Sequence, residues 1–201
     1  MIKVGVLISG RGSNLQAIID ASDRGEISAQ VAVVISNNPD AYGLERAKRH
    51  NIPTVVIDHR QYQDKNTYEL EVVKVLKKYN VDLVCLAGYM RIVGPVLLEH
   101  YHGKMMNIHP ALLPSFPGLH AQKQALEYGV KISGATVHFV DEGCDTGPII
   151  IQSAVEVKED DTEETLAARI LEQEHKIYPQ AIKLFAEGKL KIEGRRVRIL
   201  N

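Results

Sequence analysis

The sequence is poor in cysteine and tryptophan, and this narrows the chemistry open to the protein. Its 201 residues include only two cysteines, Cys85 and Cys144, and no tryptophan. The cysteines lie too far apart for the short spacing of a zinc site, and two cysteines do not make the disulfide framework of a small secreted protein. We therefore expect a cytoplasmic protein of a reducing compartment, without a bound metal.

Long apolar runs and an excess of charge of one sign are absent as well. No run approaches the roughly 20 residues of a membrane helix. The first residues, M-I-K-V-G-V-L-I-S-G, are typical of a strand and not of a signal peptide. Lysine and arginine number 24 against 25 aspartates and glutamates, which makes the net charge −1. We therefore expect neither a membrane nor a nucleic acid as partner.

What the sequence does contain is an alternation of two kinds of segment. Short runs rich in valine and isoleucine predict buried strands, and stretches with apolar residues three and four positions apart predict helices. The predicted strands are residues 3–9, 31–36, 54–57, 81–87, 104–109, 135–140 and 149–157. The predicted helices are residues 15–22, 43–50, 67–79, 95–101 and 120–128, followed by a long helical region that ends at Gly188.

This alternation predicts the α/β class, with a Rossmann-like, open and mostly parallel twisted sheet that carries helices on both faces. The last two long strands follow one another without a helix, so part of the sheet is expected to be antiparallel. We expect Asp161 and Glu164 to cap the last helical region and Pro179 to bend or split it. Two short strands are predicted around Glu193 and Gly194 in the tail.

A functional site is predicted around the stretch M-N-I-H-P-A-L-L-P-S-F-P-G, which begins at Met106. Residues two apart in a strand share a face, so Asn107 and His109 point to the same side. Pro110 lacks the N–H group that a sheet ladder needs, and the strand should end there. The amide and the imidazole then lie at the edge where open parallel sheets bind ligands. A purely structural polar strand end is the alternative.

A second candidate site is the glycine-rich turn G-R-G-S-N, which starts at Gly10 and connects the first strand to the first helix. The free N–H groups and the dipole of a helix N-terminus bind phosphate well. The turn lacks the third glycine of a dinucleotide-binding motif and the lysine of a nucleotide triphosphatase. A phosphate monoester is therefore the better expectation, and a tight turn with an ordinary N-cap is the alternative.

Asp145 is the best partner for His109, because it lies in a glycine-flanked loop between two buried strands. A neighbouring carboxylate would raise the pKa of His109 and fix the orientation of its ring. Asn107 could donate to an oxygen that gains charge. Cys144 has no evident base and is expected to be structural. The three polar residues suit acyl transfer to an external nucleophile, without a covalent enzyme intermediate.

Two other ionisable residues are open to interpretation. His138 lies within an apolar strand and is expected to be a hydrogen-bonded core residue. Glu174 falls near the apolar stripe of the last helix, where it is either a ligand contact or a solvated residue at a bend. His100 and His102 have no further ligands near them in the sequence, so a metal site is not expected there.

Several longer motifs resemble a known family. N-I-H-P-A-L-L-P-S-F-P-G-L-H and G-A-T-V-H-F-V-D-E-G-C-D-T-G-P-I-I resemble the formyltransferases that use 10-formyltetrahydrofolate. V-L-I-S-G-R-G-S-N-L-Q-A-I-I-D, S-N-N-P-D-A-Y-G-L-E-R-A and L-A-G-Y-M-R-I are similar to the members that act on glycinamide ribonucleotide. The resemblance covers residues 1–188. It implies one domain with a phosphate-binding half (1–100) and a catalytic and folate-binding half (101–188), before a short tail (189–201).

The resemblance also implies roles for individual residues. Asn107, His109 and Asp145 would be catalytic. The substrate's phosphate and ribose would contact Gly12, Ser13, Asn14 and Glu174. The folate would contact Lys65, Met90, Arg91, Ile92, Val93, Asp141, Glu142, Gly143 and Cys144. The implied co-substrate is 10-formyltetrahydrofolate, with no metal.

The implied reaction is transfer of a formyl group to the amine of glycinamide ribonucleotide, in purine biosynthesis. A hydrolase of 10-formyltetrahydrofolate and a non-catalytic nucleotide-binding module are the alternatives. A methionyl-tRNA formyltransferase would carry an RNA-binding extension, and a deformylase an N-terminal regulatory domain. Neither is expected for a chain that begins at the first strand and stops soon after the last helix. The protein is expected to bind small molecules and to be a possible homodimer.

Overall fold

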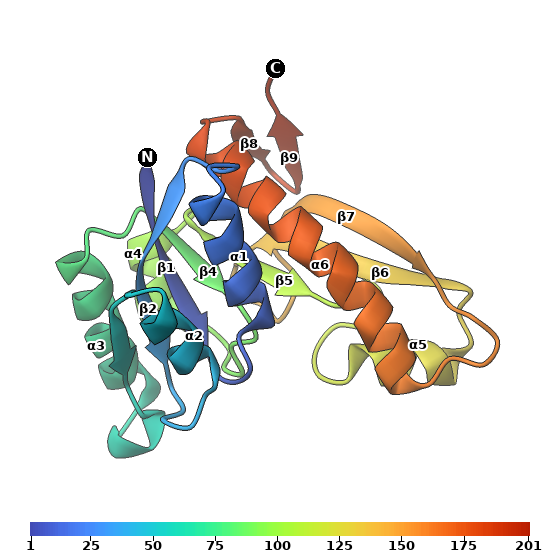
Figure 1. Ribbon diagram of the computed structural model, residues 1–201, viewed down its shortest axis with the longest axis horizontal. Coiled ribbons are helices and arrows are strands. Elements are labelled where there is room, and N and C mark those ends of the chain that lie inside the picture. The colour runs from blue at the N-terminus through green and yellow to red at the C-terminus, as the bar shows by residue number, and fades with distance from the viewer.

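The protein is built on one twisted sheet of nine strands with helices on both faces (Figure 1). The computed structural model describes all residues, 1–201. The strands are β1 (Ile2–Ile8), β2 (Ala29–Ser36), β3 (Thr54–Val56), β4 (Leu83–Leu86), β5 (Met105–His109), β6 (Ile132–Phe139), β7 (Ile149–Glu156), β8 (Leu190–Glu193) and β9 (Arg196–Ile199). The helices are α1 (Ser13–Asp23), α2 (Gly43–Arg49), α3 (Lys65–Lys78), α4 (Pro95–Tyr101), α5 (Ala121–Tyr128) and α6 (Glu163–Ala186), with a 3₁₀ turn, η1, at His59–Gln61.

The strand order places a topological switch point beside β1. The order is β3-β2-β1-β4-β5-β6-β7-β9-β8, and the first five strands in this order run parallel. From β1 the chain builds outward to β3, and it then returns to build β4 and β5 on the other side of β1. In open α/β sheets the carboxyl ends of the strands at such a point form a crevice that binds ligands.

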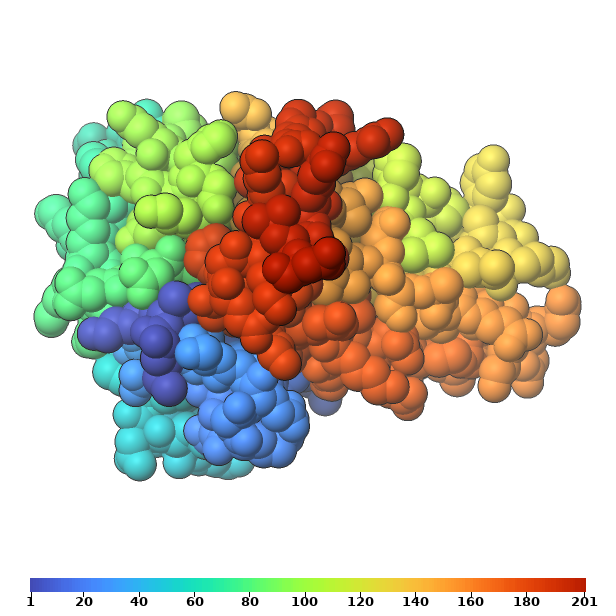
Figure 2. All heavy atoms as spheres, turned by 90° about the horizontal axis from the view of Figure 1, so that it is seen from above, coloured from blue at the N-terminus to red at the C-terminus, as the bar shows by residue number.

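The second part of the sheet changes direction. β6 pairs antiparallel with β5 and with β7, which confirms the predicted antiparallel part. The predicted tail strands are confirmed as β8 and β9, and β9 extends the sheet beyond β7. Figure 2 shows these red C-terminal residues on the surface, between the blue-to-green first half and the orange segment. The predicted division into a domain and a tail stays a prediction.

Alternation along the strands separates two apolar layers. Val6 and Ile8 of β1 belong to the layer that α1, α2, α5 and α6 cover, whereas Leu7 belongs to the layer under α3 and α4. Tyr178 of α6 is fully buried, and its hydroxyl lies 2.8 Å from the Leu86 carbonyl oxygen and 3.1 Å from that of Met106. The longest helix is therefore bound directly to β4 and β5, the two strands next to the switch point. None of the helices is both long and apolar enough to cross a bilayer.

Two details of α6 differ from the predictions. Its N-cap is Thr162, which exchanges hydrogen bonds with Thr165, and not the predicted pair of Asp161 and Glu164. Asp161 instead binds the guanidinium of Arg169, at 2.8 Å for each of two bonds. The helix also runs through Pro179 without a break, so the predicted split is wrong. Packing of its apolar stripe on the sheet outweighs the one backbone bond that proline removes.

Candidate active site

A cavity of about 570 Å³ lies at the switch point. Its walls come from α1, β5, α6, the segment after β4, the loop before α5 and the loop after β6. Asn107, His109 and Asp145 line its middle, and Asn14 and Glu174 also line it. A separate cavity of about 410 Å³ lies at the amino ends of β1–β4 and contains none of the predicted site residues. The cavity at the carboxyl ends is therefore the candidate active site.

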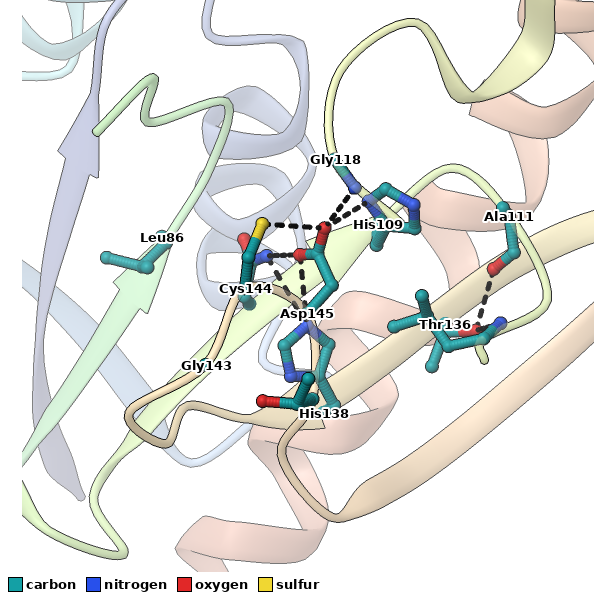
Figure 3. A network of polar contacts seen from close by, with 12 residues as sticks. Leu86, His109, Ala111, Gly118, Thr136, His138, Gly143, Cys144 and Asp145 are labelled. Carbon is teal, nitrogen blue, oxygen red and sulfur yellow. Dashed lines mark hydrogen bonds and ion pairs between the residues drawn. The ribbon is translucent and has the colours of Figure 1, made fainter. Parts of the chain in front are cut away.

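The structure brings Asn107, His109 and Asp145 together, and Figure 3 shows His109 and His138 on two sides of the Asp145 carboxyl group. His109 Nδ1 lies 3.4 Å from Asp145 Oδ2, and Asn107 Nδ2 lies 3.4 Å from Asp145 Oδ1. The predicted shared face of Asn107 and His109 on β5 is confirmed, whereas Met106 and Ile108 pack into the opposite apolar layer. Alternation along one strand thus delivers both side chains to one carboxyl group.

His109 is 4% exposed, and both of its ring nitrogens face oxygen atoms. Its Nε2 lies 2.7 Å from the Phe116 carbonyl oxygen, an acceptor, so Nε2 carries a proton and donates it. Burial lowers the pKa of His109, although the Phe116 carbonyl and the Asp145 carboxylate both oppose this effect. As predicted, Asp145 acts to raise this pKa, but the larger effect of burial, which the sequence alone does not reveal, makes the net shift downward.

Asp145 is surrounded by hydrogen-bond donors. The Gly118 N–H donates to Oδ2 at 2.8 Å, and His138 Nε2 lies 3.7 Å from Oδ1. Burial alone would raise the pKa of Asp145, but His138, the Gly118 N–H and the charge of His109 together lower it to about 2. Asp145 also adopts a left-handed backbone with φ of 55°, which aspartate tolerates better than most residues. The side chain is thus held as a carboxylate.

His138 is a site residue that the sequence analysis missed. It pairs across the antiparallel ladder with Asn107, and its Nε2 lies 3.4 Å from Asn107 Nδ2. Its other ring nitrogen, Nδ1, is 2.8 Å from the Phe139 carbonyl oxygen, so Nδ1–H donates there, and Nε2 is left to face Asp145 Oδ1. The available signal was a histidine in an apolar strand shortly before Asp145.

The far end of the cavity is formed by Asn14 of α1 and Glu174 of α6. Asn14 Nδ2 donates to Glu174 Oε1 at 3.2 Å, and both side chains are buried. Burial raises the pKa of Glu174 to about 7, and the hydrogen bond from Asn14 only partly opposes this. Asn14 Oδ1 is buried without a partner. Of the two predicted positions for Glu174, the structure shows the one at the cavity.

The start of α1 fits the predicted phosphate cradle. Gly12 has a φ of 73°, and a Cβ there would lie 2.7 Å from the Gly43 Cα, so only glycine fits. No side chain caps the helix, and the backbone N–H groups of Ser13, Asn14 and Leu15 have no partner in the protein. Unpaired N–H groups are a general property of a helix N-terminus, and these three lie at or next to Asn14 in the cavity wall.

The residues predicted for the folate are spread over two walls. Met90, Arg91, Ile92 and Val93 line the cavity, and so do Gly143 and Cys144. No backbone N–H or C=O of Arg91, Ile92 or Val93 makes a hydrogen bond within the protein. This wall therefore offers free donors and acceptors beside the exposed apolar side chains of Met90 and Ile92.

Three other predicted residues do not line the cavity. Asp141 accepts hydrogen bonds from the Gly143 N–H and the Thr146 hydroxyl, which shapes the loop. Glu142 lies in the same loop and is exposed. Lys65 is the first residue of α3, next to Gly94. No group of three or more His, Cys, Asp and Glu side chains is arranged to hold a metal ion.

Comparison with known proteins identifies the family. A family model described as "Formyl transferase" matches residues 2–182. The chain belongs to the formyl transferase family. Phosphoribosylglycinamide formyltransferase of Escherichia coli is 46% identical over 95% of this chain and 90% of its own length. A crystal structure of glycinamide ribonucleotide transformylase 1 from Symbiobacterium toebii superimposes with a TM-score of 0.99, at 57% identity, over 100% of this chain and 95% of that one.

Longer relatives contain the same region. The trifunctional purine biosynthetic protein adenosine-3 of Drosophila melanogaster is 50% identical over 92% of this chain, and the match covers 14% of that protein. The human trifunctional protein is 49% identical over 94% of this chain and 19% of its own length. The formyl transferase chain thus spans only a small part of these relatives.

Proposed function

We propose that this enzyme transfers the formyl group of 10-formyltetrahydrofolate to the amine of glycinamide ribonucleotide, in purine biosynthesis. The observation that carries the proposal is the cluster of Asn107, His109 and Asp145 in the middle of one cavity, with a helix N-terminus at one end. The likeness to enzymes named for this reaction, over nearly their whole length, supports it.

The phosphorylated substrate would bind at the α1 end of the cavity. Its phosphate would accept hydrogen bonds from the free N–H groups at Ser13 and Asn14, next to Gly12, where the helix dipole also favours an anion. Its ribose hydroxyls would contact Glu174 and the unpartnered Oδ1 of Asn14. The amine would then extend towards Asp145, in the middle of the cavity.

The reduced folate would bind at the opposite wall. A pterin ring carries both donors and acceptors along its edge, and the free backbone groups of Arg91, Ile92 and Val93 match such an edge. The apolar side chains of Met90 and Ile92 would cover the ring. Lys65, Asp141 and Glu142 lie outside the cavity wall and would contact only the outer parts of the molecule.

Asn107 and His109 would stabilise the oxyanion that forms when the amine attacks the formyl carbon. Both contacts of the Asn107 amide nitrogen are long, at 3.4 Å, so this group is free to donate to a substrate oxygen. Protonated His109 supplies a second donor. To donate through Nε2, it must release the Phe116 carbonyl oxygen, to which Nε2 is bound at 2.7 Å.

Asp145 would act mainly as a fixed negative charge. A carboxylate with a pKa of about 2 is a weak base, but it stabilises a protonated His109 beside it. As the C–N bond forms, the amine loses one proton to Asp145, directly or through water. His109 gives one proton to the departing folate nitrogen as the old C–N bond breaks, so the protons balance.

The deciding assay measures release of tetrahydrofolate from 10-formyltetrahydrofolate with and without glycinamide ribonucleotide. Release that depends on the amine supports the transferase. Release without the amine would show a hydrolase, and no release in either case would show a binding module. His109→Asn should lower kcat on the order of 100-fold or more, since it removes an oxyanion donor. Near wild-type turnover of this variant would refute the assignment of His109.

A further inference from the structure

Residues 87–94 connect β4 to α4 without regular structure, yet they carry one wall of the cavity. Because Arg91, Ile92 and Val93 leave their backbone groups unpaired, nothing inside the segment itself fixes their direction. A loop of this kind binds a planar ligand well only if its backbone groups already point the right way. Two side chains outside the segment hold its backbone at two points by hydrogen bonds, in addition to the 2.8 Å contact between the Tyr89 and Tyr68 hydroxyls and the burial of Val93.

The first point is Ser9, which directly follows β1. The Met90 N–H donates to Ser9 Oγ at 2.9 Å. The Ser9 hydroxyl in turn donates to Asn37 Oδ1, so its proton faces away from Met90 and its lone pairs face the Met90 N–H. Asn37 Nδ2 lies 3.3 Å from His59 Nδ1. A chain of buried polar groups therefore orients the Ser9 oxygen.

The second point is Glu69 of α3, whose side chain is 2% exposed. Its Oε1 accepts from the Gly94 N–H, and its Oε2 accepts from the Leu97 N–H at 3.1 Å. A Cβ at Gly94 would lie 2.9 Å from Glu69 Oε1, so the backbone approaches the carboxyl group as closely as glycine allows. Glu69 thus joins the end of the segment to the start of α4.

We propose that Ser9 and Glu69 are positioning residues for the formyl donor, which fix the backbone of residues 90–93 in its binding conformation from both ends. This inference rests on the proposed function. Neither residue lines the cavity, so each acts through the segment and not by touching the ligand. The amine substrate binds at the other end, near Asn14 and Glu174, and its binding does not depend on these contacts.

The test compares Ser9→Ala with Ser36→Ala. Ser36 is the last residue of β2 and is also buried, but its hydroxyl binds only Asn38, at 2.7 Å to the carbonyl oxygen and 3.0 Å from the N–H. Both variants remove a buried serine hydroxyl from the carboxyl end of neighbouring strands. Ser9→Ala should raise the KM for 10-formyltetrahydrofolate about five- to tenfold, the effect of one hydrogen bond, while the KM for glycinamide ribonucleotide stays within twofold. Ser36→Ala should change neither KM by more than twofold.

Two further variants keep the test decisive. Ser9→Thr retains the hydroxyl and should restore most of the affinity for the formyl donor. Glu69→Gln retains one acceptor and should show the same selective rise as Ser9→Ala, so it decides the case if Ser9→Ala does not fold. An unchanged KM for the formyl donor in both variants, or an equal rise in both KM values, would overturn the proposal.

Hydrogen exchange at the Met90 amide gives a readout that needs no ligand. We expect exchange to be at least about tenfold faster in Ser9→Ala than in wild type and unchanged in Ser36→Ala, since only the former loses the acceptor. Equal exchange in all three proteins would overturn the proposal. Absence of turnover in the wild-type protein would instead refute the proposed function, and the exchange experiment would still decide whether Ser9 holds the segment.

Discussion

The middle and one end of the cavity each hold a carboxyl group, and the pKa values of the two groups move in opposite directions. The pKa of Asp145 is lowered to about 2, whereas the pKa of Glu174 is raised to about 7. Asp145 faces His109, His138, Asn107 and the Gly118 N–H, but Glu174 faces a single donor, Asn14. More donors and shallower burial keep Asp145 charged, whereas deep burial with a single donor keeps Glu174 protonated to higher pH. The cavity thus combines a permanent negative charge with a group that titrates near neutrality.

The largest effect should come from removing the permanent charge. Asp145→Asn keeps the shape of the side chain but leaves His109 without a negative partner, so protonated His109 becomes costly in its buried position. We expect kcat to fall on the order of 1,000-fold, as for other charge-to-amide changes beside a catalytic histidine. Steady-state kinetics with both substrates saturating measures this. A loss smaller than tenfold would mean that the charge of Asp145 is not needed.

The next effect is on the free energy of unfolding, which should depend on pH through the ionisation of Glu174. The folded protein holds this carboxyl protonated up to a pKa of about 7, whereas the unfolded chain ionises it near its ordinary value of 4.5. Between these values the unfolded chain binds fewer protons, so the free energy of unfolding should fall by about 3 kcal/mol as pH rises from 4.5 to 7. Glu174→Gln should remove this slope. Urea unfolding of both proteins at several pH values tests it, and parallel curves would show that Glu174 ionises normally.

A smaller effect should follow from removing one of the hydrogen-bond donors around Asp145. His138→Phe keeps a ring of similar width but removes the imidazole, whose contact lowers the pKa of Asp145. The pKa of Asp145 should then rise towards its usual range, and the acid limb of the pH profile of kcat/KM should move to higher pH. We expect about a tenfold loss of kcat, since the charge next to His109 is also less well oriented. A profile identical to wild type would show that His138 is only a core residue.

The smallest effect should come from removing an exposed side chain that contacts the loop of Asp145. Arg195, in the turn between β8 and β9, donates to the Thr146 carbonyl oxygen at 2.6 Å, but its side chain is 70% exposed. Exposed contacts of this kind contribute little in water. Arg195→Ala should therefore change kcat and both KM values by less than about twofold. A larger change would mean that the tail, and not the buried donors alone, positions Asp145.

The parts of the fold that sequence predicted were those set by local patterns. The period of two along β5 placed Asn107 and His109 on one face, because alternation depends only on the strand itself. The paired direction of β5 and β6 depends on contacts between distant residues, and this is why His138 was read as a core residue although it lies opposite Asn107. Burial is likewise a property of the whole fold. It reversed the expected pKa direction at His109, which neighbouring charges alone would have raised.

The N-cap of α6 was predicted wrongly, and the reason lies within the helix and the residues just before it. Asp161 and Thr162 are both good N-caps, and the choice between them was decided by Arg169, two turns further along the helix, which binds Asp161. The proposed role of Met90 came from a family resemblance and not from any pattern in the chain, whereas the glycine-rich turn at Gly12 and the position of Glu174 also pointed to ligand contacts from the sequence itself. The structure places all three beside the cavity or in its wall, but their roles stay proposals until the assays are done.

The hydrogen bonds between Tyr178 and the sheet fix the spacing between Glu174 and Asn107. Tyr178 is one helical turn beyond Glu174, and its hydroxyl is bound to the carbonyl of Met106, the residue before Asn107. Glu174 and Asn107 are therefore joined by one turn of rigid helix, one hydrogen bond and one residue of strand, with no flexible loop in between. The spacing between Glu174 and Asn107 is thus built into the scaffold, and under the proposed function an amine shortened or lengthened by one bond should be a poorer substrate.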